Sequence, residues 1–167
     1  AVIALLGLST PSGSLYEVDI RLRPDGAKGL LVSSMESFEQ YQKQRAWTWE
    51  LQALVRARAV AGDPPLCQRF ERAREALIAV ERDSGPLLDE ISAMRRRMRA
   101  ELDRSDDGHY DLKHGRGGLT DIEFFLQAQI LPHASRVPEL VRERETMAVI
   151  DRLRSAGIVD VRQAGVL

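Results

Sequence analysis

Two long stretches of the chain, residues 65–82 and 86–103, repeat apolar residues at intervals of three or four and have no proline beyond their first position. This spacing places the apolar side chains on one face of an α-helix. The apolar members are Phe70, Ala73, Leu77 and Val80 in the first stretch and Leu87, Ile91, Met94 and Met98 in the second. Because only Asp83-Ser84-Gly85 separates the two helices, they are expected to pack as antiparallel neighbours in a helical bundle.

Further helices are expected on both sides of this pair. Ser34 is placed to cap a helix that begins at Met35, and apolar residues recur at helical spacing from Trp47 to about residue 60. The run Gly62-Asp63-Pro64-Pro65 ends that pattern and starts a new helix, and a last helix is expected from about residue 143 to 155. The sequence therefore predicts two units, residues 1–62 and 63–167, divided at this break.

The segment before residue 34 follows a different period. Every second residue from 16 to 22 is apolar, which is typical of a β-strand with one packed face. A Pro24-Asp25-Gly26 turn and a short apolar return at residues 30–32 predict a hairpin. The expected fold class is mainly α with a small β part.

The other face of this strand carries Glu17, Asp19, Arg21 and Arg23. A carboxylate followed by two arginines on the same face would place a metal-binding oxygen beside two phosphate-binding guanidiniums. By periodicity alone, an ordinary half-exposed strand with alternating salt-bridge partners is the preferred interpretation. The order of the charges favours a functional strand.

A second candidate site is the glycine-rich stretch from Lys113 to Gly118, directly before a helical pattern. Its glycines let the backbone approach another group closely, and the helix start beyond them would offer unpaired N–H groups for phosphate. Lys113 adds positive charge. The alternative is a tight connector in which Thr120 or Asp121 caps the helix.

Asp121 and Glu123 follow this loop and lie two positions apart on the expected helix. Their side chains should point in rather different directions, so they are not an evident metal pair. One of them is instead expected to fix an arginine such as Arg21 or Arg56.

Composition excludes several classes of partner. The formal net charge of −1 gives no support for nucleic-acid binding by bulk electrostatics. Arginines 95, 96, 97 and 99 stand beside acidic residues of the same helix, so charge pairs on a solvated face explain them.

The single cysteine, Cys67, cannot form an intramolecular disulfide, which fits a reducing compartment such as the cytoplasm. Residues 1–8 are apolar but too few to cross a bilayer, so no membrane association is expected.

Three phrases connect these features to a known family: LYEVDIRLRPDGAKGLLVSS, FEQYQKQRAWTWELQALVRARAVAGD and YDLKHGRGGLTDIEFFLQ. They resemble the bacterial glutamine-synthetase adenylyltransferases, bifunctional enzymes that attach AMP to a tyrosine of glutamine synthetase and remove it again. The resemblance covers most of residues 15 to 131 and implies the end of a polymerase-beta-like nucleotidyltransferase domain, residues 1–62. A bundle similar to that of the PII-uridylyltransferase, truncated in this chain, would follow at residues 63–167. The stretch from Ala46 to Leu54 is most similar to the C-terminal, adenylylating half.

The resemblance implies a role for each matching residue. Asp19 would be a catalytic carboxylate that binds magnesium. Contacts to the nucleotide or its phosphates are expected from Arg21, Arg23, Lys113, Gly117 and Gly118. Asp121 and Glu123 would support the site structurally.

The family's Gly-Ser turn with an Asp-x-Asp pair does not precede Asp19 in this sequence. A two-metal site needs several carboxylates, so the chain is expected to be a fragment that begins inside the catalytic domain and to be inactive by itself. In the intact enzyme, the expected partners are ATP, glutamine synthetase and the PII signalling protein. The alternatives are the deadenylylating half, which phosphorolyses AMP-tyrosine, and a non-catalytic helical module for regulation or interaction.

Overall fold

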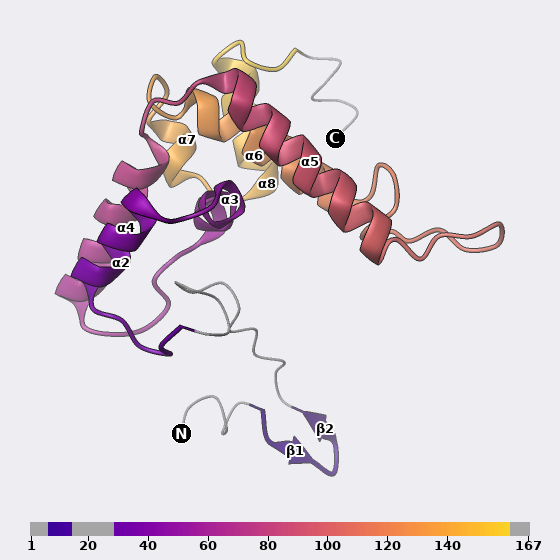
Figure 1. The fold of residues 1–167 in the computed structure, drawn as a ribbon, viewed down its shortest axis with the longest axis horizontal. Coiled ribbons are helices and arrows are strands. Elements are labelled where there is room, and N and C mark those ends of the chain that lie inside the picture. Colours follow the sequence, from indigo (N-terminus) through magenta and orange to yellow (C-terminus); the bar gives the residue numbers. More distant parts are fainter. Residues whose placement is uncertain (1–6, 15–28, 161–167) are drawn as a thin grey trace.

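A computed structural model of the chain describes residues 7–14 and 29–160, and this part is mainly helical (Figure 1). The predicted fold class, mainly α with a small β part, is confirmed. The seven helices of the described part are α2 (Met35–Gln44), α3 (Thr48–Arg56), α4 (Pro64–Ile78), α5 (Ser84–Leu102), α6 (Leu119–His133), α7 (Glu139–Arg142) and α8 (Thr146–Ser155). The strands are β1 (Ser9–Thr10) and β2 (Gly13–Ser14).

Three helices begin after a residue whose side chain caps them, as predicted for Ser34 and Asp63, whereas α5 begins two residues before its predicted start at residue 86. The side chain of Ser34 accepts a hydrogen bond from the N–H of Ser37 at the start of α2. Asp63 caps α4 in the same way, with two prolines in the first turn, and Asp83 caps α5. Each of these side chains satisfies an N–H group that the helix leaves unpaired.

Two helices end earlier than predicted. α3 stops at Arg56 instead of about residue 60, and α4 stops at Ile78 instead of about residue 82. The guanidinium of Arg82 explains the second difference, because it donates to the carbonyl oxygens of Leu77, Ile78 and Val80. These acceptors would otherwise continue the helix, so the arginine closes it.

The helices enclose one cluster of buried apolar side chains. Its members include Leu54 and Val55 of α3, Leu77 and Ile78 of α4, Leu87 and Ile91 of α5, Leu126 and Ile130 of α6, Leu140 of α7, and Ile150 and Leu153 of α8. Because α3 contributes two of these residues, the core extends across the boundary predicted between residues 62 and 63. The two predicted units share a core in the described part.

The expected antiparallel pairing of the two long helices is wrong. α4 packs mainly on α2 and α3, whereas α5 packs mainly on α6 and α3. Figure 1 shows α4 and α5 diverging from the segment that connects them. Burial decides this arrangement, because α3 packs on both long helices, while α2 covers α4 and α6 covers α5.

The β part also differs from the prediction. β1 and β2 form a short antiparallel hairpin in which Thr10 lies opposite Gly13, whose φ of 106° suits glycine. Residues 30–32, predicted as a returning strand, adopt no strand and are exposed. No described residue pairs with them, and a lone extended segment gains no ladder hydrogen bonds. The strand predicted at residues 16–22 and the turn at residues 24–26 lie outside the described residues.

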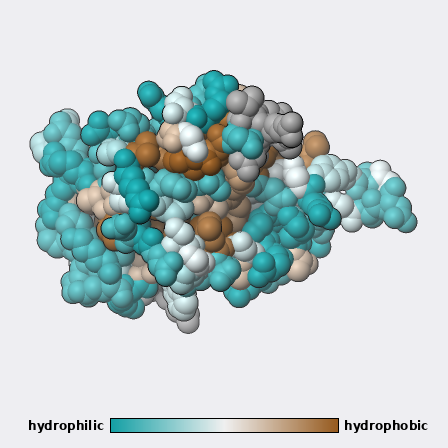
Figure 2. All heavy atoms as spheres, turned by 90° about the horizontal axis from the view of Figure 1, so that it is seen from above, coloured by the Kyte–Doolittle hydropathy of each residue, from teal (hydrophilic) through white to brown (hydrophobic). Residues whose placement is uncertain are grey.

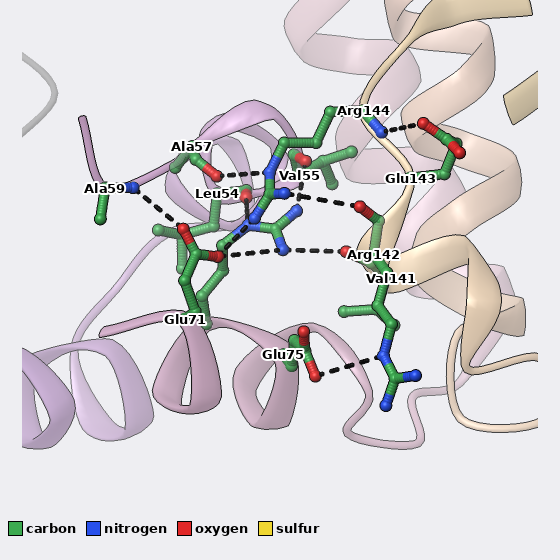
Figure 3. A network of polar contacts seen from close by, with 11 residues as sticks. Leu54, Val55, Ala57, Ala59, Glu71, Glu75, Val141, Arg142, Glu143 and Arg144 are labelled. Atoms are coloured by element: carbon green, nitrogen blue, oxygen red, sulfur yellow. Dashed lines mark hydrogen bonds and ion pairs between the residues drawn. The ribbon is translucent and has the colours of Figure 1, made fainter. Parts of the chain in front are cut away.

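Arg74 joins three helices through main-chain acceptors. Its side chain is fully buried and donates to the carbonyl oxygens of Leu54 at 2.7 Å, Val55 at 2.6 Å and Val141 at 2.8 Å. Figure 3 shows the surrounding network, in which Arg144 bonds both the carbonyl oxygen of Ala57 and the carboxylate of Glu71. These contacts satisfy carbonyl groups at the ends of α3 and α7.

The surface in Figure 2 is mostly hydrophilic, with apolar side chains gathered in one band and a smaller group beside it. The projection at one end, which Figure 1 shows as the connection between α5 and α6, is largely hydrophilic. Within the described part, no helix has both the length and the apolar character required to cross a membrane.

Candidate functional site

The candidate site lies at the junction of α5, α6 and the loop between them. The loop is folded around Asp111, whose carboxylate accepts hydrogen bonds from the N–H groups of Lys113 and His114, both at 2.9 Å. The carbonyl oxygen of Asp111 accepts a third bond, from the N–H of Gly115, at 2.8 Å. The N–H of His114 is the main cause that lowers the pKa of Asp111 below its ordinary value.

The start of α6 is occupied by this loop. Gly118 is the N-cap residue, and the N–H groups of Leu119 and Thr120 donate to the carbonyl oxygens of Leu112 and Lys113, each at 3.0 Å. The N–H of Gly118 donates to Gly115. The prediction of unpaired N–H groups at this helix start is therefore wrong, because the loop's own carbonyl groups take the place of an anion.

The glycines are required by this close folding. A Cβ atom on Gly118 would lie 2.6 Å from the carbonyl oxygen of Leu112, and one on Gly115 would lie 2.5 Å from that of Asp111. Gly117 has a φ of 83°, in the left-handed region that favours glycine. The close approach anticipated for these glycines is thus made to the loop itself.

Asp121 ties the loop to both helices. One carboxylate oxygen accepts from the N–H of Gly117 at 2.6 Å, and the other accepts from Nε of Arg95 at 2.5 Å. Nη2 of Arg99 lies 2.7 Å from each oxygen. The carboxylate therefore has partners in the loop and in α5, while its own backbone belongs to α6.

Arg95 of α5 also bonds directly to the loop. Its Nη2 donates to the carbonyl oxygen of His114 at 2.8 Å, and its guanidinium lies over the ring of Phe124 at 6.0 Å. Its side chain is only 8% exposed, and within the described part its Nη1 has no hydrogen-bond partner. A buried guanidinium needs an acceptor of opposite charge, which Asp121 provides.

This arrangement corrects the interpretation of the arginine tract. Arg95 and Arg99 were expected on a solvated face, paired with acids of their own helix, but both pair with Asp121 of α6. Arg96 and Arg97 are exposed. The signal in the sequence was the four-residue spacing from Ile91 to Arg95 and Arg99, which places both arginines on the buried face of α5.

A cleft of about 540 Å³ opens beside this cluster. Its walls combine Arg96, Arg99 and Asp121 with the apolar side chains of Ile122, Phe124 and Phe125. Burial raises the pKa of Asp121, but the hydrogen bonds from Gly117, Arg95 and Arg99 outweigh it and hold that pKa below the ordinary value of 3.8. Asp121 is therefore charged at neutral pH.

The structure places the residues predicted for the site in different environments, some in the loop and others exposed to solvent. Lys113 is exposed, whereas Gly117 and Gly118 form the last turn of the loop before α6. Glu123 is also exposed and is not part of the Asp121 cluster. Asp121 does fix arginines, as one of the two acids was expected to do. Its partners are Arg95 and Arg99.

Other predictions concern residues elsewhere. Arg56, offered as a partner for one of these acids, donates instead to the carbonyl oxygen of Arg144 and to Oγ1 of Thr146, each at 2.8 Å. Asp19, Arg21 and Arg23 lie outside the described residues. Among residues 7–14 and 29–160, no group of three or more histidine, cysteine or acidic side chains is arranged to hold a metal ion.

Two family models match the chain. One, described as glutamate-ammonia ligase adenylyltransferase, matches residues 1–73, and the other, described as GlnD PII-uridylyltransferase, matches residues 92–167. The second match contains the whole Asp121 cluster and the glycine loop.

Bifunctional glutamine synthetase adenylyltransferase/adenylyl-removing enzymes from several bacteria are similar over nearly the whole chain. The protein of Xanthomonas axonopodis pv. citri is 55% identical over 152 residues, which are 91% of this chain and 16% of that protein. Those of Stenotrophomonas maltophilia and Nitrosococcus oceani are 52% and 46% identical over 95% and 99% of this chain, in each case 17% of the relative. The chain thus spans about one sixth of the length of these relatives. At these identities it belongs to the family of bifunctional glutamine synthetase adenylyltransferase/adenylyl-removing enzymes.

Proposed function

We propose that this chain is part of an enzyme that transfers AMP from ATP to a tyrosine of glutamine synthetase. Within that bifunctional enzyme, it would belong to the adenylylating half. The observation that carries the proposal is the identity of 55% over 152 residues to a protein with that named activity. The preference for the adenylylating half rests on the stretch from Ala46 to Leu54. The products would be adenylylated enzyme and pyrophosphate, in the cytoplasm of a bacterium.

Lys113 is the described residue proposed to face the phosphates of ATP. Its N–H is held by Asp111 and its carbonyl oxygen by Thr120, so its backbone position is fixed while its side chain reaches solvent. An ammonium group carried on a fixed backbone position can reach phosphate oxygens and stabilise their charge. Gly117 and Gly118 would contribute by shaping the loop that presents Lys113, with Asp121 as its structural support. Glu123, which is exposed, would act at a distance from this loop.

The strand with Asp19 would supply the remaining chemistry. Asp19 would bind magnesium, and Arg21 and Arg23 would bind phosphate groups. The acceptor is the tyrosine of glutamine synthetase, and the PII protein would be a regulatory partner, in keeping with the match to a PII-uridylyltransferase model.

The intact enzyme tests this proposal. With labelled ATP, magnesium and glutamine synthetase, Lys113→Met should raise KM for ATP about tenfold, because a charged hydrogen bond to phosphate is lost. Asp19→Asn should abolish turnover while the protein stays folded. Lys43→Met is the matched control, since Lys43 is exposed in the last turn of α2.

Two results would contradict the proposal. If this half consumed inorganic phosphate and released ADP from adenylylated glutamine synthetase, the chain would belong to the deadenylylating half. If neither Lys113→Met nor Asp19→Asn changed either reaction, the chain would be a non-catalytic helical module.

A further inference from the structure

Asp121 is the only described residue whose side chain bonds the loop and α5 together from within α6. Its two oxygens accept four hydrogen bonds, from Gly117, from Arg95 and twice from Arg99. Arg95 and Arg99 precede Asp121 by 26 and 22 positions, and Gly117 precedes it by four. Few alternative arrangements of the loop preserve all of these bonds.

Loss of the carboxylate charge would affect more than one contact. Arg95 is 8% exposed and already has an unpartnered Nη1 within the described part, so it would become a buried cation surrounded by neutral acceptors only, such as the carbonyl oxygen of His114. Leaving a buried charge without its partner is strongly unfavourable. The side chain of Arg95 would therefore turn toward solvent. This movement would break the hydrogen bond from its Nη2 to the carbonyl oxygen of His114.

The same cluster controls where Lys113 lies. The first turn of α6 holds the carbonyl oxygens of Leu112 and Lys113 through the N–H groups of Leu119 and Thr120. Asp121 occupies the next position of this turn and fixes Gly117, the left-handed residue that reverses the chain. The position of Lys113 is thus determined from both ends of the loop, by Asp111 on one side and by the Asp121 cluster on the other.

We propose that Asp121, held by Arg95 and Arg99, is a positioning residue that keeps the loop of residues 112–118 in the one conformation in which Lys113 serves the nucleotide. The inference rests on the proposed function of Lys113. Asp121 itself does not touch the nucleotide in this mechanism. Its effect on the reaction passes through the loop.

The test uses the intact enzyme with Asp121→Asn, which preserves size but removes the charge. Hydrogen exchange at the amides of Gly117, Leu119 and Thr120 should become about tenfold faster, and KM for ATP should rise about tenfold with a smaller change in kcat. Asp89→Asn is the matched control, because Asp89 is exposed on α5. It should change neither exchange nor kinetics.

Each outcome decides between the two proposals. Faster exchange without a change in KM for ATP would overturn the positioning role, provided that Lys113→Met still raises KM. If Lys113→Met also had no effect, the proposed function of Lys113 would be wrong instead. If Asp121→Asn failed to fold, Arg99→Met would decide, since Arg99 is 34% exposed and its loss leaves the Arg95 bond to Asp121 in place. Unchanged exchange at Gly117 in that variant would overturn the inference.

Discussion

The guanidinium of Arg74, in the second half of α4, donates a hydrogen bond of 2.8 Å to the carbonyl oxygen of Val141 in α7. The two residues are 67 positions apart in the sequence. Burial, followed by the like charge of Arg144, lowers the pKa of Arg74 to about 10, so the group remains charged at neutral pH. The charge is dispersed over three carbonyl oxygens at the ends of two helices.

Arg74→Met is expected to lower the free energy of unfolding by about 3 kcal/mol, because three buried carbonyl groups lose their donor while the side-chain volume is nearly kept. Urea unfolding of the chain measures the change. Arg72→Met, two positions away and exposed, is the control and should leave stability nearly unchanged. A small effect of Arg74→Met would show that the helix ends find other donors.

Gly118→Ala should destabilise the loop by about 2 kcal/mol, because its new Cβ would lie 2.6 Å from the carbonyl oxygen of Leu112. Thermal unfolding and amide exchange at Leu119 report the change. Gly108→Ala provides the comparison, since its nearest atom, Oδ1 of Asp106, would be 3.7 Å away. Equal effects at the two positions would argue against the crowding seen at Gly118.

The pH dependence of the loop should follow Asp121. Its pKa is below the ordinary value of 3.8, so its contribution to stability is fully present above that pH. This contribution is lost as the pH falls through the lower, folded-state pKa, because protonation removes the charge that Arg95 and Arg99 bind. A carboxyl NMR titration should place the midpoint for Asp121 below 3.8. A midpoint at or above that value would contradict the observed bonds.

Glu71 and Arg144 should be energetically coupled. Their side chains are 29% and 30% exposed, and Glu71 also accepts the N–H of Ala59. A double-mutant cycle with Glu71→Gln and Arg144→Met is expected to give about 0.5–1 kcal/mol after allowance for solvent screening. The exposed pair of Asp151 and Arg154 should give a coupling near zero.

Local sequence determined where several helices begin. Ser34 and Asp63 each cap a helix start through contacts within three residues, so propensity and capping chemistry suffice to place these starts. The mainly α class and the apolar faces follow from the same short-range periodicity. The family resemblance was also carried by the sequence, because long matching phrases need no knowledge of packing.

Tertiary structure alone decided which helices are neighbours and which acceptors the buried arginines bond. The loop between α4 and α5 suggested an antiparallel pair, but α4 packs on α2 and α3 while α5 packs on α6 and α3, since burial of the apolar faces depends on all elements at once. Arg95 and Arg99 were predicted on a solvated face, and Arg74 carried no prediction, yet each of the three reaches an acceptor at least 19 positions away. Such partners are chosen by the fold because a buried guanidinium must find an acceptor wherever the assembled chain supplies one.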